Sequence, residues 1–278
     1  MSAQPSNANR VAVLRERMST VVGRTLMFVI LLGIWLLAAN LQPNFVPTPW
    51  AVLSTVGTWL GDGTISDNIG TTLYEVFVGA ALAFGIGIPV GLVLAQSRFL
   101  DNATRPYIDV MNAIPRIGLA PLFVLWFGLG QTSKIALVFS VLFFIVVINV
   151  HAGVKSVERE HIVLATLLGA SRWDIAMKVL LPSLVPWIIA SLRLTSAYGV
   201  SAAVIGEFVA GSNGLGYLLA YHSSVLNPSG SFAALFLLAL VSLTLTFLTM
   251  LLERHALRWR NPGGRVRAAQ RRREPTGV

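Results

Sequence analysis

Six long apolar stretches constrain this chain more than any other feature of its sequence. They lie near residues 25–41, 70–95, 113–129, 134–152, 184–206 and 231–252. Most approach the ~20 residues that a helix needs to cross ~30 Å of hydrocarbon, and lipid requires each segment to satisfy its own backbone polar groups. Charged residues make up only 12% of the chain, roughly half of the ~25% found in soluble domains. The sequence predicts an all-α integral membrane protein with about six transmembrane helices.

Basic residues gather on alternate connections between these stretches. Lysines and arginines precede the first stretch, lie between the second and third and between the fourth and fifth, and follow the sixth. The connections 42–69 and 207–230 contain neither. This positive-inside pattern places both termini in the cytoplasm of a multi-pass protein of the cell membrane. We therefore expect a cytoplasmic tail 1–24, a transmembrane domain 25–252 and a basic cytoplasmic tail 253–278.

The arrangement of charge and the absence of certain residue types limit the partners and the chemistry expected of this chain. The net charge of +9 is arranged as expected for lipid headgroups rather than for nucleic acid. The absence of cysteine excludes disulfides and thiolate metal sites. The histidines lack the spacing of metal ligands, and no group of residues suggests a catalytic centre. We predict no catalytic, cofactor-binding or metal-binding residues.

Glycines in the second apolar stretch indicate close helix packing rather than nucleotide binding. Gly87 and Gly91 form a small-xxx-small pair inside that stretch, away from any strand-to-helix turn. Residues 128–134 resemble a phosphate loop only superficially, because Lys134 follows Ser133 instead of preceding a serine or threonine. No Walker-type loop occurs elsewhere, so ATP, if it is used, must bind to another chain.

The connection 153–183 is the only one with clear internal structure. A helical run over residues 157–168 is followed by Gly169, and glycine commonly ends a helix because it accepts positive φ without strain. The residues after this glycine predict a second short helix close to the first. The pattern taken alone is typical of an ordinary hairpin of two helices.

The second helix of this connection has its own start and stop signals. Ser171 can cap it, with Asp174 completing a capping box three residues later. We expect the helix to run to Leu181 and to end there, because Pro182 lacks the backbone N–H that would continue it.

The connection resembles the cytoplasmic "EAA" loop of binding-protein-dependent ABC importer permeases. In that motif Glu-Ala-Ala is followed at fixed spacing by a glycine and then by Ile-x-Leu-Pro. Here Ala165 and Gly169 stand at an alanine position and at the glycine, and Leu181 and Pro182 match the end of the motif. Val163 stands where the family has glutamate, which leaves the choice of ATPase partner open.

Further motifs extend the resemblance over roughly 40–260 and are similar to the branch that serves nitrate, sulfonate and taurine uptake. They are the segments 45–49, 120–122, 125–130 and 214–217. The resemblance implies a permease subunit that forms the translocation pathway of an ATP-driven importer. The implied partners are two copies of a cytoplasmic ATP-binding subunit, an extracytoplasmic solute-binding protein and a second permease copy, most simply as a homodimer.

In the family that this chain resembles, the loop docks on the ATP-binding subunit. Carried over to this sequence, the docking residues are Ala165, Leu168, Gly169, Ala170, Ser171, Asp174, Leu181 and Pro182. ATP itself is expected to be bound by the partner subunit. The alternative to this reading is a self-sufficient channel or secondary transporter, which would leave the structured loop without a role.

Polar residues inside the fifth apolar stretch are candidates for the translocation pathway. Arg193, Ser196 and Glu207 fall near one face of a helix, and intramembrane charge usually faces a cavity or a partner. Two structural alternatives stay open at this point: Arg193 can snorkel to the cytoplasmic interface, and Glu207 can lie at the outer one. Arg116, beside Pro115, is expected only at an interface position.

Overall fold

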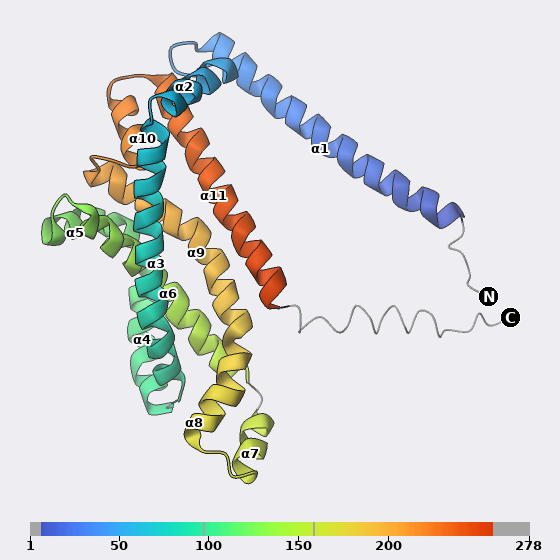
Figure 1. The fold of residues 1–278 in the computed structure, drawn as a ribbon, viewed down its shortest axis with the longest axis vertical. Coiled ribbons are helices and arrows are strands. Elements are labelled where there is room, and N and C mark those ends of the chain that lie inside the picture. The colour runs from blue at the N-terminus through green and yellow to red at the C-terminus, as the bar shows by residue number, and fades with distance from the viewer. Residues whose placement is uncertain (1–6, 97, 158, 258–278) are drawn as a thin grey trace.

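The computed structural model describes residues 7–96, 98–157 and 159–257, and every regular element in these ranges is helical (Figure 1). The predicted all-α class is confirmed, whereas residues 1–6 and 258–278 of the two predicted tails lie outside the described ranges. In chain order the helices are α1 (Asn7–Leu41), α2 (Pro49–Gly61), α3 (Thr64–Gln96), α4 (Arg98–Ala113), α5 (Ala120–Phe127), α6 (Gln131–Lys155), α7 (Arg159–Leu167), α8 (Arg172–Ile175), α9 (Leu181–Ala210), α10 (Leu215–Ser224) and α11 (Pro228–Ala256).

Within the described ranges, five helical segments are long and apolar enough to cross a membrane: 18–41, 64–95, 131–155, 173–210 and 228–256. They correspond to five of the six predicted stretches. The other stretch, 113–129, is divided between the end of α4, a short 3-10 segment at Arg116–Leu119 and the helix α5. Pro115 explains the division, because proline disfavours helical backbone at the preceding residue and cannot donate to the preceding turn.

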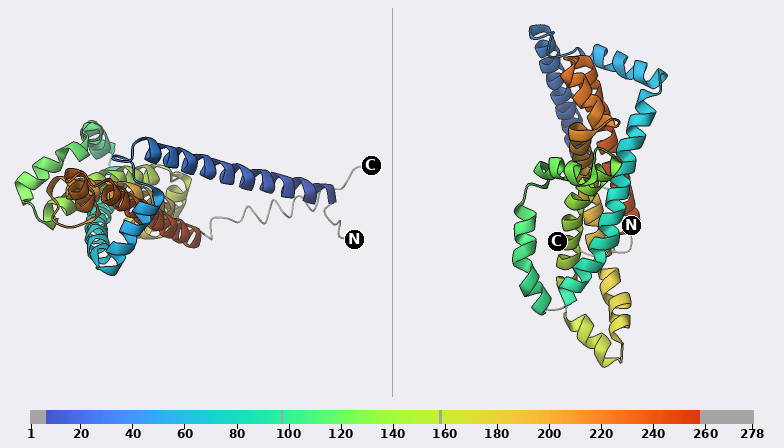
Figure 2. Two further views of the ribbon diagram at one scale, coloured as in Figure 1. Left: turned by 90° about the horizontal axis from the view of Figure 1, so that it is seen from above. Right: turned by 90° about the vertical axis from the view of Figure 1, so that its left-hand side faces the viewer.

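The centre of the molecule is formed by α3, α6 and α9, which pack side by side (Figures 1 and 2). A Cβ added to Gly87 would meet the Val146 side chain at 3.0 Å, and one added to Gly91 would meet Val150 at 2.9 Å. Side chains at these two glycines would therefore force α3 away from α6. The close packing predicted for this pair of glycines is confirmed.

At one end of the molecule, α2 and α10 pack against α3 and α11 (Figure 1). The Trp59 ring of α2 stacks on His222 of α10, with ring centroids 5.1 Å apart. The bend formed by α7 and α8 lies at the opposite end (Figure 1). The core helices thus separate two ends with different architectures.

Helix α1 extends away from the other helices (Figures 1 and 2). Contacts to the rest of the chain occur near its C-terminal end, where Trp35 Nε1 donates to the Pro47 carbonyl at 3.0 Å. The Trp35 ring also stacks on Phe232 of α11, with centroids 6.3 Å apart. Most described side chains of α1 are apolar and exposed, including Phe28 and Leu37.

A polar link holds α4 to α6 near the end of the molecule that carries α7 and α8. Asp101 on α4 is almost buried, and its carboxylate lies 2.7 Å from His151 Nε2 and accepts a hydrogen bond from Lys155. The hydrogen bond from Lys155, joined by that from His151, holds the pKa of Asp101 below its ordinary value against the opposing effect of burial.

The expected break at Pro182 is wrong. A π-helical turn, Ala176–Leu180, follows α8, and α9 then continues through Pro182 and Pro186 to Ala210. Pro182 lies in the first turn of α9, where the backbone N–H that proline lacks would have had no partner within that helix. The wider π turn accommodates the proline without ending the helix.

Candidate functional site

The bend between α7 and α8 is fixed by backbone geometry. Gly169 has a φ of +81°, in the left-handed region that glycine adopts without strain. Its N–H donates to the Thr166 carbonyl at 3.0 Å, and the N–H of Ala170 donates to the Ala165 carbonyl at 3.0 Å. These two bonds form a Schellman motif, so the predicted helix end at Gly169 is confirmed.

The start of α8 is capped as the sequence predicts. Ser171 Oγ accepts from the Asp174 N–H at 3.1 Å, and the Asp174 carboxylate accepts from the Ser171 N–H at 3.2 Å. Lys178 Nζ also donates to this carboxylate, at 2.7 Å. The reciprocal bonds make a capping box. The bend is therefore locked on both sides, while Leu181 and Pro182 lie beyond it in α9.

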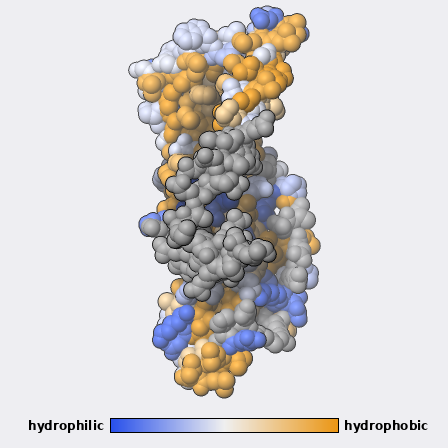
Figure 3. Space-filling view, turned by 90° about the vertical axis from the view of Figure 1, so that its right-hand side faces the viewer, coloured by the Kyte–Doolittle hydropathy of each residue, from blue (hydrophilic) through white to orange (hydrophobic). Residues whose placement is uncertain are grey.

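The outer surface of the bend is apolar. Leu167 and Leu168 are 79% and 80% exposed, and Trp173 is 72% exposed. Val163 and Leu164 are exposed beside them, and we refer to these five residues as the apolar tip. Figure 3 shows this lower end of the molecule as an apolar surface bordered by hydrophilic residues. A contiguous exposed apolar surface with a polar border is typical of a protein contact site.

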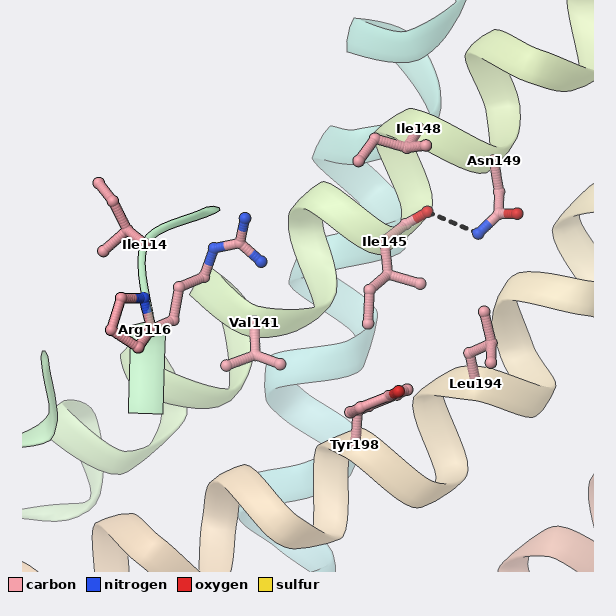
Figure 4. A pocket seen from close by; sticks show the side chains of 9 residues that line it. Ile114, Arg116, Val141, Ile145, Ile148, Asn149, Leu194 and Tyr198 are labelled. Carbon is pink, nitrogen blue, oxygen red and sulfur yellow. Dashed lines mark hydrogen bonds between the residues drawn. The ribbon is translucent and has the colours of Figure 1, made fainter. Parts of the chain in front are cut away.

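A cavity of about 470 Å³ opens beside α6 and α9. Its walls come from the segment before α5, from α6 and from α9 (Figure 4). The described lining residues are Ile114, Pro115, Arg116, Val141, Ile145, Ile148, Asn149, Leu194 and Tyr198. Arg116 therefore lies in the wall of a cavity, which is more than the interface position expected for it. Pro115 and the 3-10 turn that follows carry the arginine to this place.

The three residues predicted for the pathway are not brought together. Arg193 faces α11, with its guanidinium 4.0 Å from the Glu253 carboxylate. Ser196 is buried, and its hydroxyl donates to the Arg193 carbonyl at 2.7 Å. Glu207 is fully buried. From α9, the described residues that line the cavity are instead Leu194 and Tyr198, so the pathway role of the predicted three stays a prediction.

Glu207 belongs to a buried polar cluster that joins α9 to α3 and α10. Its carboxylate accepts from Thr72 Oγ1 at 2.7 Å and from the Gly216 N–H at 2.6 Å. Thr72 Oγ1 in turn accepts from the Leu215 N–H at 3.0 Å, and Asn68 Oδ1 accepts from the Gly214 N–H at 2.7 Å. The cluster satisfies backbone donors at the start of α10, which no intrahelical acceptor can reach.

A buried ion pair completes this cluster. Lys134 Nζ on α6 lies 3.0 Å from Glu75 Oε1 on α3, and the two side chains are 3% and 0% exposed. The sequence analysis did not identify Glu75 as a candidate, although a carboxylate inside an apolar stretch is itself a signal. In the sequence, Lys134 stands out as the basic residue next to the short turn 130–133 and as part of a phosphate-loop pattern that does not match. Its pairing with α3 could not be read from neighbouring residues.

Comparison with known proteins places the chain in a family. Residues 87–259 match the family described as "Binding-protein-dependent transport system inner membrane component". The taurine transport system permease protein TauC of Escherichia coli is 32% identical over 238 residues, covering 83% of this chain and 86% of that protein. The riboflavin transport system permease protein RibX of Chloroflexus aurantiacus is 34% identical over 253 residues, covering 90% and 94%.

Solved structures share the fold. An inward-facing conformation of the MetNI methionine ABC transporter has a TM-score of 0.61 at 21% identity, covering 68% of this chain and 94% of that chain. An amino acid ABC transporter has a TM-score of 0.60 at 19% identity, covering 73% and 97%. The chain therefore belongs to the binding-protein-dependent inner membrane transport components, and it is a permease subunit of the ABC importer type.

Proposed function

We propose that the apolar tip docks this permease on a cytoplasmic ATP-binding subunit, which supplies the energy for import. The observation that carries the proposal is the combination of a rigid bend with an exposed apolar surface. The Schellman motif and the capping box hold the bend in one shape. Leu167, Leu168 and Trp173 then offer apolar area that no described part of the chain covers. A rigid contact is needed to pass motion from one subunit to another.

Two copies of the permease are proposed to assemble around the translocation pathway. Helix α1 supports this assembly, because most of its described apolar side chains lack an intramolecular partner. Exposed apolar side chains also lie on other long helices, for example Phe77 on α3 and Phe236 on α11. Lipid covers part of this surface in the membrane, and a second copy related by a two-fold axis would cover another part.

The end of the molecule formed by α2 and α10 is proposed to face the outside and to receive a solute-binding protein. The connections at this end lack lysine and arginine, as expected for the outer side. Trp50 on α2 and Leu226 after α10 are strongly exposed there. In this orientation the α7–α8 bend and both termini are cytoplasmic, and ATP binds to the partner subunit rather than to this chain.

The transported solute is proposed to be a small organic compound. The relatives named above are transport proteins for taurine and riboflavin. Taurine is a small zwitterion, whereas riboflavin is a much larger molecule without an ionised group. Sequence similarity therefore supports the general class of solute more than any one compound. Alternating access between the two permease copies would move it, with closure of the ATP-binding subunits pushing on the two bends.

Affinity purification from native membranes in mild detergent tests the docking proposal. We expect an ATP-binding subunit to co-purify with the wild-type chain and to be lost from Leu168→Ser. Leu60→Ser is the matched control, because Leu60 is 71% exposed on α2 at the opposite end of the molecule. If Leu168→Ser retains the ATP-binding subunit as well as Leu60→Ser does, the apolar tip is not the docking surface. Purification of a folded wild-type chain without any such subunit would contradict the importer assembly itself.

A further inference from the structure

The cavity beside α6 and α9 has the composition of a small-molecule site. Its volume of about 470 Å³ lies in the range of pockets that hold organic ligands. Most of its lining is aliphatic, and three polar side chains interrupt it: Arg116, Asn149 and Tyr198. Pockets with an apolar wall and a few fixed polar groups bind ligands that combine an apolar body with one or a few polar groups.

Arg116 is held in a defined orientation in this wall. Its guanidinium carbon lies 4.2 Å from the centroid of the Phe144 ring on α6, and Nη2 donates to the Met111 carbonyl at 2.8 Å. These contacts come from two different elements, so the guanidinium is fixed relative to both. A guanidinium presents five N–H donors in a planar fork, which matches the spacing of oxyanion oxygens.

The other polar groups lie across the same space. Asn149 Nδ2 donates to the Ile145 carbonyl at 2.8 Å, which fixes the carboxamide (Figure 4). Tyr198 and Leu194 project from α9 toward α6 (Figure 4).

We propose that this cavity is a translocation subsite for a small organic oxyanion. The carboxylate or sulfonate group of the solute binds to Arg116. The apolar body of the solute lies against the aliphatic wall formed by Ile145 and Leu194, with Tyr198 as a further hydrogen-bond donor. The inference rests on the proposed import function, which it deepens by naming the class of solute.

Equilibrium dialysis with benzoate and its neutral isostere benzamide tests the subsite. The sample is the full-length permease in lipid nanodiscs, with the partner subunits that it retains. We expect Arg116→Gln to weaken benzoate binding by about tenfold or more, because a hydrogen bond between ions is lost. Benzamide binding is expected to change less than twofold, which separates loss of the charge from loss of the cavity. Tyr198→Phe is expected to weaken both probes about threefold.

The matched control is Arg254→Gln, which removes the same charge from an exposed position on α11. We expect it to leave the binding of both probes unchanged. Equal benzoate affinity in wild type and Arg116→Gln overturns the proposal, and so does wild-type protein that binds neither benzoate nor ethanesulfonate saturably. If Arg116→Gln fails to assemble, the Tyr198→Phe result decides, with unchanged affinity counting against the subsite.

A phospholipid headgroup has the same oxyanion chemistry and must be distinguished. Native mass spectrometry of the same samples detects lipid that stays bound. A phospholipid that is retained by the wild type, lost from Arg116→Gln and not displaced by benzoate would overturn the assignment to a transported solute. Failure of the import function is recognised separately, by the absence of a co-purifying ATP-binding subunit. The benzoate measurement does not depend on that outcome.

Discussion

Lys134→Met tests whether the buried ion pair holds α6 to α3. The ammonium lies 3.0 Å from the Glu75 carboxylate, and both side chains are almost completely buried. Methionine keeps much of the apolar stem but removes the charge, so the carboxylate of Glu75 loses its counterion. Removing one partner of a buried pair typically costs about 3–5 kcal/mol, because the charge left behind has neither water nor a partner. For chains of this size about 1 kcal/mol lowers Tm by roughly 2 °C or more, so a fall of roughly 6 °C or more is expected.

The assay is thermal unfolding of the detergent-solubilised chain, followed by the loss of the monodisperse peak in size-exclusion chromatography. Lys178→Met is the matched control. Lys178 also pairs with a carboxylate, that of Asp174, but its side chain is 76% exposed. Exposed pairs contribute between about 0 and 1 kcal/mol, so this variant is expected to shift Tm by roughly 2 °C or less.

A double variant distinguishes the cost of leaving the Glu75 carboxylate without a counterion from the cost of losing the contact between Lys134 and Glu75. Lys134→Met combined with Glu75→Leu removes both charges, and replacing a buried pair by apolar residues is often nearly neutral. We expect the double variant to recover most of the loss in Tm. If Lys134→Met melts within the range of Lys178→Met, or if the double variant melts lower than Lys134→Met, the reasoning about the buried pair is refuted.

Gly169→Arg is expected to leave the chain folded but to abolish ATP hydrolysis stimulated by solute, because the bend at a φ of +81° is lost; normal stimulated hydrolysis would contradict the docking proposal. Gly214→Ala is expected to cost about 2 kcal/mol or more, since its Cβ would meet the Glu207 carboxyl at 2.2 Å and its φ is +111°. Gly70→Ala has open space and is expected to raise Tm slightly, so equal Tm values for these two variants would count against the cluster. Asp101→Asn is expected to lower Tm at neutral pH, and the loss is expected to shrink below about pH 4. The lowered pKa of this carboxyl means that its contribution is lost as pH falls through that range, and a difference that grows as pH falls below about 4 would contradict this sign.

The α7–α8 bend could be predicted in detail because its determinants are local. A glycine in the left-handed region and a Ser-x-x-Asp capping box act within a few residues of the chain. Gly169, Ser171 and Asp174 therefore have the roles that their order in the sequence indicates. The same local reasoning failed at Pro182. The π turn Ala176–Leu180 changes the hydrogen-bond register before this proline, and no residue pattern in the sequence predicts that turn.

The cavity and the buried cluster depend on contacts between distant parts of the chain. Thr72 and Glu207 form a hydrogen bond although 135 residues separate them. The sequence identified Glu207 as a costly intramembrane charge but assigned it to a pathway face or an outer interface. The structure places it against Thr72 and the start of α10 because α9 packs beside α3. Helix periodicity shows which residues share a face of one helix, but it does not indicate which neighbouring helix packs against that face.

The sequence by itself determined that this chain crosses a membrane as helices, that it carries a structured bend, and which family it belongs to. Apolar length, charge asymmetry and local turn chemistry act along the chain and need no knowledge of packing. Only the tertiary structure decided that Arg116 lines a cavity and that Lys134 pairs with Glu75. The energy of a buried charge depends on what surrounds it in space, and that environment exists only after the helices have packed.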